Sequence, residues 1–174
     1  MSKVLAVANQ KGGVGKTTTS VNLAASLVAT RKKVLLVDID PQGNATSGSG
    51  VNKNDPELTI YDVLIEDTPV EQAIIAAKDE TQFDLIPANG DLTGAEVQLL
   101  NMSVKESRLR NALARIRSRY DYIVVDCPPS LNMLTVNGLV AADSVVVPIQ
   151  CEYYALEGLT ALMNTIEKIR SVLN

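Results

Sequence analysis

The 174-residue sequence predicts an α/β fold in which helices flank a parallel β-sheet on both faces. Short runs that are apolar at every position alternate with longer segments of helical periodicity, and such runs are typical of strands buried on both faces. The alternation favours right-handed crossovers from one parallel strand to the next. A glycine-rich segment between the first strand and the first helix is a third indication, because phosphate-binding α/β proteins place such a loop there.

The expected strands lie near residues 3–8, 33–37, 83–86, 122–126 and 144–148. The expected helices lie near residues 17–30, 104–119, 132–141 and 155–172. Residues 44–82 are the least regular part, and two short amphipathic helices are expected there, at 59–66 and 69–77. Because no linker, repeat or low-complexity tract divides the chain, residues 1–174 are expected to form a single domain with a substantial core.

The composition excludes several classes of protein. Hydrophobic residues make up 46% of the chain and aromatic residues 3%, which indicates an aliphatic core. No apolar stretch approaches the roughly 18 residues of a membrane span, and the N-terminus has no signal-peptide pattern. The absence of histidine excludes imidazole catalysis and imidazole metal ligands. Cys127 and Cys151 lack metal-ligand spacing, so we expect both to be reduced, buried thiols of a cytoplasmic protein.

Residues 11–18 read KGGVGKTT and form the candidate phosphate-binding loop. Glycines let backbone N–H groups approach phosphate oxygens, and the N-terminus of the following helix adds partial positive charge. Lys16 is expected to reach the β- and γ-phosphates, and the Thr17 hydroxyl to ligate Mg²⁺. A glycine-rich turn without a ligand is the alternative, but it leaves the paired lysines and threonines unexplained. The predicted nucleotide-binding residues are Lys11, Gly12, Gly13, Val14, Gly15, Lys16, Thr17 and Thr18.

Two predicted strands lead into aspartates that would face the same region. Asp40 follows the strand near 33–37, and Asp126 ends the strand near 122–126. Ligands of open parallel sheets bind outside the carboxyl ends of the strands. Asp126 therefore fits a carboxylate that holds Mg²⁺ through a water, and Asp40 is a second candidate for the same ion, also through a water. The alternatives are a helix cap for Asp126 and a plain turn for Asp40 with Pro41 and Asn44.

These motifs resemble those of the ParA/Soj-type chromosome and plasmid partition ATPases, which belong to the deviant Walker A class of P-loop NTPases in the MinD/ParA superfamily. The matching segments are residues 9–18 (NQKGGVGKTT), 38–46 (DIDPQGNAT), 126–130 (DCPPS), 148–150 (PIQ) and 152–159 (EYYALEGL). The usual phosphate loop begins with glycine, whereas Gln10 stands there and Lys11 follows it. The resemblance covers residues 2–162 and implies ATP and Mg²⁺ as cofactors, with weak ATP hydrolysis that a ParB-type partner stimulates.

The resemblance also implies roles for single residues. Lys11 would reach across a nucleotide-sandwich dimer to the phosphates held by the other subunit, and Asp40 would position the attacking water. With Lys16, these are the implied catalytic residues, because the γ-phosphoryl transition state needs positive charge on its oxygens and an oriented nucleophile. The match at 126–130 places Pro128 beside the nucleotide.

Family members usually have longer chains, so the resemblance implies that this chain lacks a C-terminal part. In the family, that part supplies the adenine pocket and much of the DNA-binding surface. The implied partners are a ParB-type partition protein, non-specific DNA and a second copy of the chain in an ATP-dependent homodimer, with no membrane. The implied location is the cytoplasm, in association with the nucleoid.

Positive charge is concentrated in the helix expected near 104–119, although the net charge of the chain is −4. Its arginines border an apolar stripe, and two interpretations stay open: a solvated rim around a packed helix, or a surface for nucleic acid or a partner. A chain of negative net charge is not expected to coat DNA by bulk charge. In the last helix, Glu157 and Glu167 offset the positive side chains Lys168 and Arg170. This balance favours packing on the sheet over lying on a membrane.

Three functions are compatible with the glycine-rich loop, and an ATP-driven switch for DNA partition is favoured. A MinD-like membrane-associated regulator of cell division shares the loop, but it normally needs a basic amphipathic C-terminus, and residues 41–44 and 152–159 resemble the partition branch. A reductase like the nitrogenase iron protein needs cluster-ligating cysteines. Cys127 directly follows Asp126, and no second cysteine has a suitable placement.

Overall fold

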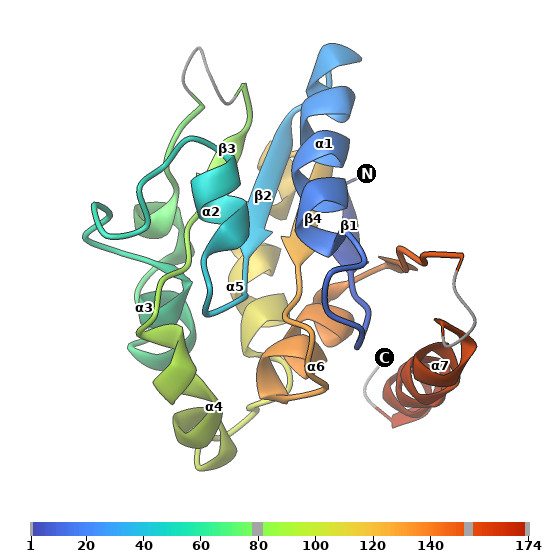
Figure 1. The fold of residues 1–174 in the computed structure, drawn as a ribbon. Coiled ribbons are helices and arrows are strands. Elements are labelled where there is room, and N and C mark those ends of the chain that lie inside the picture. Colours follow the sequence, from blue (N-terminus) through green and yellow to red (C-terminus); the bar gives the residue numbers. More distant parts are fainter. Residues whose placement is uncertain (1, 78–81, 152–154, 173–174) are drawn as a thin grey trace.

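The structure is a computed structural model that describes residues 2–77, 82–151 and 155–172. It confirms the predicted α/β fold, because five parallel strands form one sheet in the order β3-β2-β4-β1-β5, with helices on both faces (Figure 1). The strands are β1 (Lys3–Val7), β2 (Val34–Asp38), β3 (Asp84–Ile86), β4 (Tyr122–Asp126) and β5 (Ser144–Val146). The register places Val7 and Asp38 beside Asp126, so the carboxyl ends of the three central strands are level.

The helices divide between the two faces of this sheet. They are α1 (Lys16–Ala29), α2 (Asn44–Gly48), α3 (Ile60–Ile65), the 3₁₀ turn η1 (Val70–Ala73), α4 (Leu92–Leu100), α5 (Arg108–Ile116) with the 3₁₀ turn η2 (Arg117–Arg119), α6 (Met133–Ala141) and α7 (Ala155–Val172). One apolar cluster joins the sheet to α1 and α2, and a larger one joins the other face to α3, α4, α5 and α6. The sheet is therefore the middle layer of three.

Strand residues alternate between the two clusters. Leu35 and Val37 of β2 belong to the larger cluster, and Val34 and Leu36 belong to the smaller one. Successive side chains of a strand point to opposite faces, so a strand covered by helices on both faces must be apolar at every position. This requirement explains why the strands were recognisable in the sequence as uninterrupted apolar runs.

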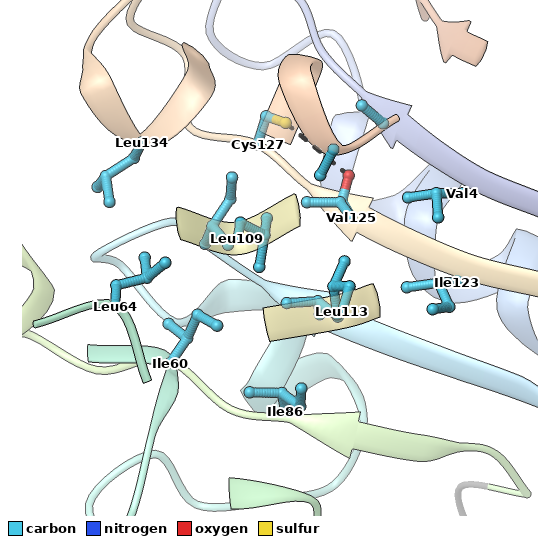
Figure 2. Packing of buried hydrophobic residues seen from close by; sticks show 14 of the residues in the cluster. Val4, Ile60, Leu64, Ile86, Leu109, Leu113, Ile123, Val125, Cys127 and Leu134 are labelled. Carbon is cyan, nitrogen blue, oxygen red and sulfur yellow. Dashed lines mark hydrogen bonds between the residues drawn. The ribbon is translucent and has the colours of Figure 1, made fainter. Parts of the chain in front are cut away.

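The larger cluster is closed by α5 and α3, as Figure 2 shows. In this view Leu113 of α5 lies between the strand residues Ile86 and Ile123, and these three side chains and that of Leu109 are at most 2% exposed. Burying an aliphatic side chain of this size contributes roughly 1.5–3 kcal/mol. The apolar stripe predicted in the basic helix is thus part of the core.

The basic helix itself is shorter than the expected range 104–119. α5 begins at Arg108, after Val104, which has a left-handed φ of 47°. A β-branched residue in that conformation cannot belong to a right-handed helix. The helical part after Ile116 is a 3₁₀ turn, so the expected helix is divided into a turn, α5 and η2.

Two arginines of this region make contacts within the chain. Arg108 donates to the Leu64 carbonyl and pairs with Asp67, and its side chain is only 11% exposed. Arg117 donates to the Ser2 carbonyl (3.0 Å) and pairs with Asp143. The expectation of a solvated rim is therefore wrong for Arg108, whose head group joins α5 to the end of α3.

The irregular part of the chain differs most from the sequence-based expectation. The helix expected at 59–66 is α3, with a capping box in which the Asp62 side chain accepts the Thr59 N–H (2.7 Å). The helix expected at 69–77 is only the 3₁₀ turn η1, because Ile75 forms an antiparallel bridge with Leu85 at the edge of the sheet. Neither α2 nor α4 was predicted. Gly94 interrupts the apolar pattern of α4, and α2 is too short to show a period.

The last helix, α7, packs on α6 and lies beyond β5 at the end of the sheet (Figure 1). Leu162 and Ile169 are buried, whereas Met163 is 44% exposed. The sequence predicted packing on the sheet, whereas the apolar stripe of α7 packs mainly on α6. The first part of the family motif at 152–159 lies outside the described residues.

Two further expectations concern the cysteines and membranes. Cys127 is buried as predicted, but Cys151 is exposed, because it lies in the surface segment that follows β5. Among the described helices, none combines the length and apolar character that crossing a bilayer requires.

Gly138 of α6 provides a test of this packing. A methyl group at Gly138 would lie 2.8 Å from Cys127 Sγ and 2.9 Å from Ile39 Cδ1, so both neighbours would have to move. We expect Gly138→Ala to lower the free energy of unfolding by about 1–3 kcal/mol, as overpacking does. Gly94→Ala in α4 is the matched control, because only the Gln98 side chain lies near, at 3.8 Å.

The control should be neutral, or stabilised by up to about 1 kcal/mol through higher helix propensity. Urea denaturation of both variants measures the difference. Equal free energies of unfolding for the two variants would show that α6 is not packed as closely against Ile39 and Cys127 as described.

Candidate functional site

The glycine-rich loop connects the carboxyl end of β1 to the start of α1. Gly13 (φ 74°) and Gly15 (φ 87°) adopt left-handed conformations that favour glycine. A Cβ built on Gly12, Gly13 or Gly15 would have no atom of the described chain within 4 Å beyond the adjoining backbone, so the loop borders open space. The first N–H groups of a helix have no intrahelical acceptor, and here they lie beside that space. The loop is thus shaped to receive an anion.

Lys16 is the first residue of α1, and its side chain is held across the loop. Its Nζ atom donates to the carbonyl of Lys11 (3.2 Å), and the residue is only 7% exposed. A buried ammonium that uses one of its three donors in this way keeps two for a ligand. The position leaves the ammonium near the start of α1, and the contact of Lys16 with phosphate oxygens stays a prediction.

Asp126, at the end of β4, is joined to the same helix by two hydroxyl groups. Thr17 donates to Oδ2 (2.8 Å), and Ser20 lies 2.6 Å from Oδ1. Burial raises the pKa of Asp126 to about 6, and the charge of Asp40 acts in the same direction. The hydrogen bonds from Ser20 and Thr17 oppose the rise, as does the charge of Lys16. Asp126 therefore holds the Thr17 hydroxyl in place and lies where a cation would stabilise its charged form.

Asp38 and Asp40 lie on the neighbouring strand end. Asp38 is fully buried, and burial followed by the charge of Asp126 raises its pKa to about 7. Asp40 Oδ1 accepts the N–H of Gln42 (2.9 Å), which forms the turn that Pro41 begins. Among the described residues, no donor contacts Asp40 Oδ2. One oxygen of Asp40 thus shapes the turn and the other can accept a proton from a ligand or a water.

The donor set fits Mg²⁺ better than a metal held by protein atoms alone. Within the described residues, no three Asp, Glu or Cys side chains converge as a metal site would require. Mg²⁺ usually keeps several waters and takes few protein ligands when it binds with a phosphate. The Thr17 hydroxyl could be such a ligand, Asp126 accepts its hydrogen bond, and Asp40 is close enough for its charge to act on Asp126. The residues present therefore fit the predicted cofactor.

The segment after β5 holds the loop from the other side. Asn9 donates to the Pro148 carbonyl (2.7 Å) and accepts the N–H of Lys11 (3.0 Å). Gln150 donates to the Gly13 carbonyl (3.0 Å). Residues 148–150 thus hold the glycine-rich loop at a defined distance from β5.

The structure brings most of the predicted site residues together. The loop residues 11–18, Asp40 and Asp126 all lie at the carboxyl edge of the sheet. Val14 is buried, Thr18 is exposed, and Lys11 is half-buried. Pro128 is buried on the segment after β4, and its contact with a nucleotide stays a prediction.

Four residues described here, Asn9, Ser20, Asp38 and Gln150, were not among the predicted site residues. Ser20 follows Thr17 by three positions, so the two hydroxyls share one face of α1, and this spacing was a usable signal. Asn9 is the first polar residue after an apolar strand, which is a weaker signal. Its partner Pro148 is 139 positions away, so the contact itself could not be read from the sequence.

Comparison with known proteins agrees with this geometry. The family model described as AAA domain matches residues 2–174. The sporulation initiation inhibitor protein Soj of Bacillus subtilis is 56% identical over the whole chain, which covers 68% of Soj. The chain belongs to the ParA/Soj family. It spans about two thirds of the length of the curated relatives it matches.

Solved structures show the same fold as this ParA/Soj-family chain. A crystal structure of cobyrinic acid a,c-diamide synthase from Mycobacterium smegmatis, with bound ATP analogue and magnesium, superposes with a TM-score of 0.95 and 43% identity, covering all of this chain and 70% of that one. A plasmid partition protein from Borrelia burgdorferi superposes with a TM-score of 0.86 and 32% identity, covering 98% of this chain and 75% of that one.

The raised pKa of Asp126 predicts a pH dependence of stability in this ParA/Soj-family chain. The pKa is raised from 3.8 to about 6, so the folded state binds the proton more tightly than the unfolded state. The stability from this group is therefore full below the unfolded pKa and is lost as the pH rises through the folded pKa. Without Mg²⁺ and nucleotide, the free energy of unfolding should fall between about pH 4 and pH 7 by on the order of 2 kcal/mol more in wild type than in Asp126→Asn.

Urea denaturation in the presence of a chelator, at several pH values, measures how steeply the free energy of unfolding changes with pH in each protein. If the two proteins show the same slope, the Asp126 carboxyl does not have the raised pKa. Added Mg²⁺ with nucleotide should reduce the loss in wild type but not in the variant.

Proposed function

We propose that residues 1–174 form a single ATPase domain that binds ATP with Mg²⁺ and acts as a molecular switch in DNA partition. The observation that carries the proposal is the hydrogen bond from Thr17 to Asp126, beside the buried Lys16 ammonium. This arrangement provides a metal-ligating hydroxyl, a carboxylate behind it and a positive charge for phosphate oxygens. The ATP analogue and magnesium named for the Mycobacterium structure support these ligands.

The residues divide the work of phosphoryl transfer. Backbone N–H groups of the loop and Lys16 hold the phosphate oxygens, and Thr17 with Asp126 orients the metal-binding side of the site. Bound Mg²⁺ would neutralise charge on the β- and γ-phosphates. Asp40 would orient the attacking water through the oxygen that the turn does not use. Positioning and charge stabilisation of this kind supply most of the catalysis in phosphoryl transfer.

We attribute the proposed dependence on a second copy to Lys11. Lys16 already supplies the positive charge from within the loop, whereas Lys11 opens the loop and is half-buried in this chain. A lysine that acts on the nucleotide of the other subunit makes hydrolysis depend on dimerisation. The proposed cycle is an ATP-bound dimer that binds non-specific DNA, weak hydrolysis that a ParB-type partner stimulates, and release as the dimer separates.

The partition role is supported by the relatives and separates this proposal from its alternatives. Soj is 56% identical, compared with 43% for the protein named as a cobyrinic acid a,c-diamide synthase, and the Borrelia structure is named a plasmid partition protein. We propose a cytoplasmic protein associated with the nucleoid. A MinD-like regulator that binds membranes remains the alternative to be tested.

The two lysines of the loop should have separable effects. Lys16→Ala should lose most nucleotide affinity, because its ammonium lies inside the loop. Lys11→Ala should bind ATP nearly as wild type does but fail to form the ATP-dependent dimer. Calorimetry with an ATP analogue measures the first effect, and light scattering with ATP measures the second. An equal loss of monomer affinity in both variants would contradict the division of tasks.

Asp40→Ala should separate binding from hydrolysis. We expect unchanged ATP affinity and a loss of turnover on the order of 10²–10³-fold, the usual effect of removing one group that stabilises the transition state. The variant should therefore accumulate on DNA in a pelleting assay with ATP, and anionic liposomes should not pellet it. Liposome pelleting without DNA pelleting would favour the MinD-like alternative. Phosphate release at the wild-type rate in a single turnover would remove Asp40 from the reaction.

A further inference from the structure

The segment that carries Asp40 is anchored by a buried carboxylate that the proposed mechanism does not use. Asp38 Oδ1 accepts the backbone N–H of Asp40 (3.1 Å). Its Oδ2 atom accepts both the N–H and the hydroxyl of Thr46, each at 2.8 Å. Asp38 is 0% exposed, and none of the described lysines or arginines pairs with it. Burying a carboxylate without a cation is costly, so these three donors are what hold it there.

Thr46 extends this anchor to the next strand. It is also 0% exposed, and its hydroxyl accepts the N–H of Ala88 (2.9 Å) while it donates to Asp38. Ala88 follows β3, so a continuous path of hydrogen bonds runs from the Asp40 backbone through Asp38 and Thr46 to the end of β3. Both hydrogen-bonding directions of the Thr46 hydroxyl are used, which leaves one orientation for the group.

The start of α2 packs closely against Ala88, the residue that Thr46 contacts. Gly43 has a φ of 62°, and a Cβ there would lie 2.7 Å from the Ala88 carbonyl oxygen. Gly43 cannot cap α2 with a side chain, and the Asp38 carboxylate accepts one of the N–H groups at the start of that helix instead. The segment from Asp40 to Thr46 is thus fixed at both ends on Asp38 and on the chain after β3.

We propose that Asp38 and Thr46 are positioning residues for Asp40, which set the place of its backbone and so the direction of its free carboxylate oxygen. Neither residue would touch the nucleotide. The inference rests on the proposed role of Asp40 in hydrolysis, and it predicts that damage to the anchor lowers the rate of hydrolysis while leaving nucleotide affinity nearly unchanged. Misplacing a catalytic group by about 1 Å can cost up to 10²-fold in rate.

The test uses single-turnover phosphate release and ATP affinity, measured on the full chain. Thr46→Val removes the hydroxyl at nearly constant volume and should slow hydrolysis about 10- to 100-fold, with ATP affinity within about twofold. Thr46→Ser keeps the hydroxyl and should restore most of the rate. Ser49→Ala is the matched control, because its buried hydroxyl donates only within α2, to Ala45 (2.7 Å), and its rate should equal that of wild type.

A double-mutant cycle distinguishes positioning from a general loss of structure. If Thr46 acts through Asp40, then Thr46→Val should cause no further loss in the Asp40→Ala background. An additional loss of the same size in that background would overturn the proposal, as would a wild-type rate in folded Thr46→Val. If Thr46→Val fails to fold, the same double-mutant cycle can be measured with Thr46→Ala or Asp38→Asn in place of Thr46→Val.

The two proposals can fail separately. If wild type hydrolyses ATP and Asp40→Ala does not, a wild-type rate in Thr46→Val overturns only the positioning role. If Asp40→Ala hydrolyses ATP at the wild-type rate, the proposed role of Asp40 fails and the positioning role fails with it.

Discussion

The hydrogen bonds between Asp126 and the first turn of α1 join the two elements on which the site depends. The carboxylate ends a strand that is buried from Ile123 onward, and Thr17 and Ser20 occupy one face of the helix that follows the glycine-rich loop. Because both oxygens are used, the helix start can neither rotate nor move away from β4 without leaving a buried carboxylate unsatisfied. The loop between β1 and α1 therefore has fixed ends, and its glycines supply the conformations that close it.

A second constraint acts from the opposite side of the loop. The amides of Asn9 and Gln150 connect the loop to the segment after β5, and the carbonyls that they contact are those of Pro148 and Gly13. The loop is thus held between β4 and the residues after β5, with its backbone N–H groups left toward the open side. Preorganised donors of this kind need little rearrangement when an anion binds, which is the condition for strong electrostatic stabilisation.

The acidic residues of the site gain their character from burial. Asp38 and Asp126 lie on adjacent strand ends in register, and burial raises the pKa of each. The charge of Asp40 also raises the pKa of Asp126, so a cation bound beside Asp126 would favour its charged form. Gly138 lets α6 pack closely against Ile39 and Cys127, which follow these strand ends. The chemistry of the site is therefore linked to the packing of the larger apolar cluster (Figure 2).

The sequence by itself determined the parallel sheet, the phosphate loop and the place of Asp40 and Asp126, because each has a local signal. Strands buried on both faces are apolar throughout, and the loop chemistry lies within residues 11–18. Only the tertiary structure decided which groups hold that chemistry in place. Thr46 meets Ala88, Ser20 meets Asp126 and Asn9 meets Pro148 across separations of 42, 106 and 139 residues. Strand order and register create these contacts, and no local pattern in the chain encodes them. For the same reason, the sequence did not predict α4, the burial of Arg108 or the packing of α7 on α6.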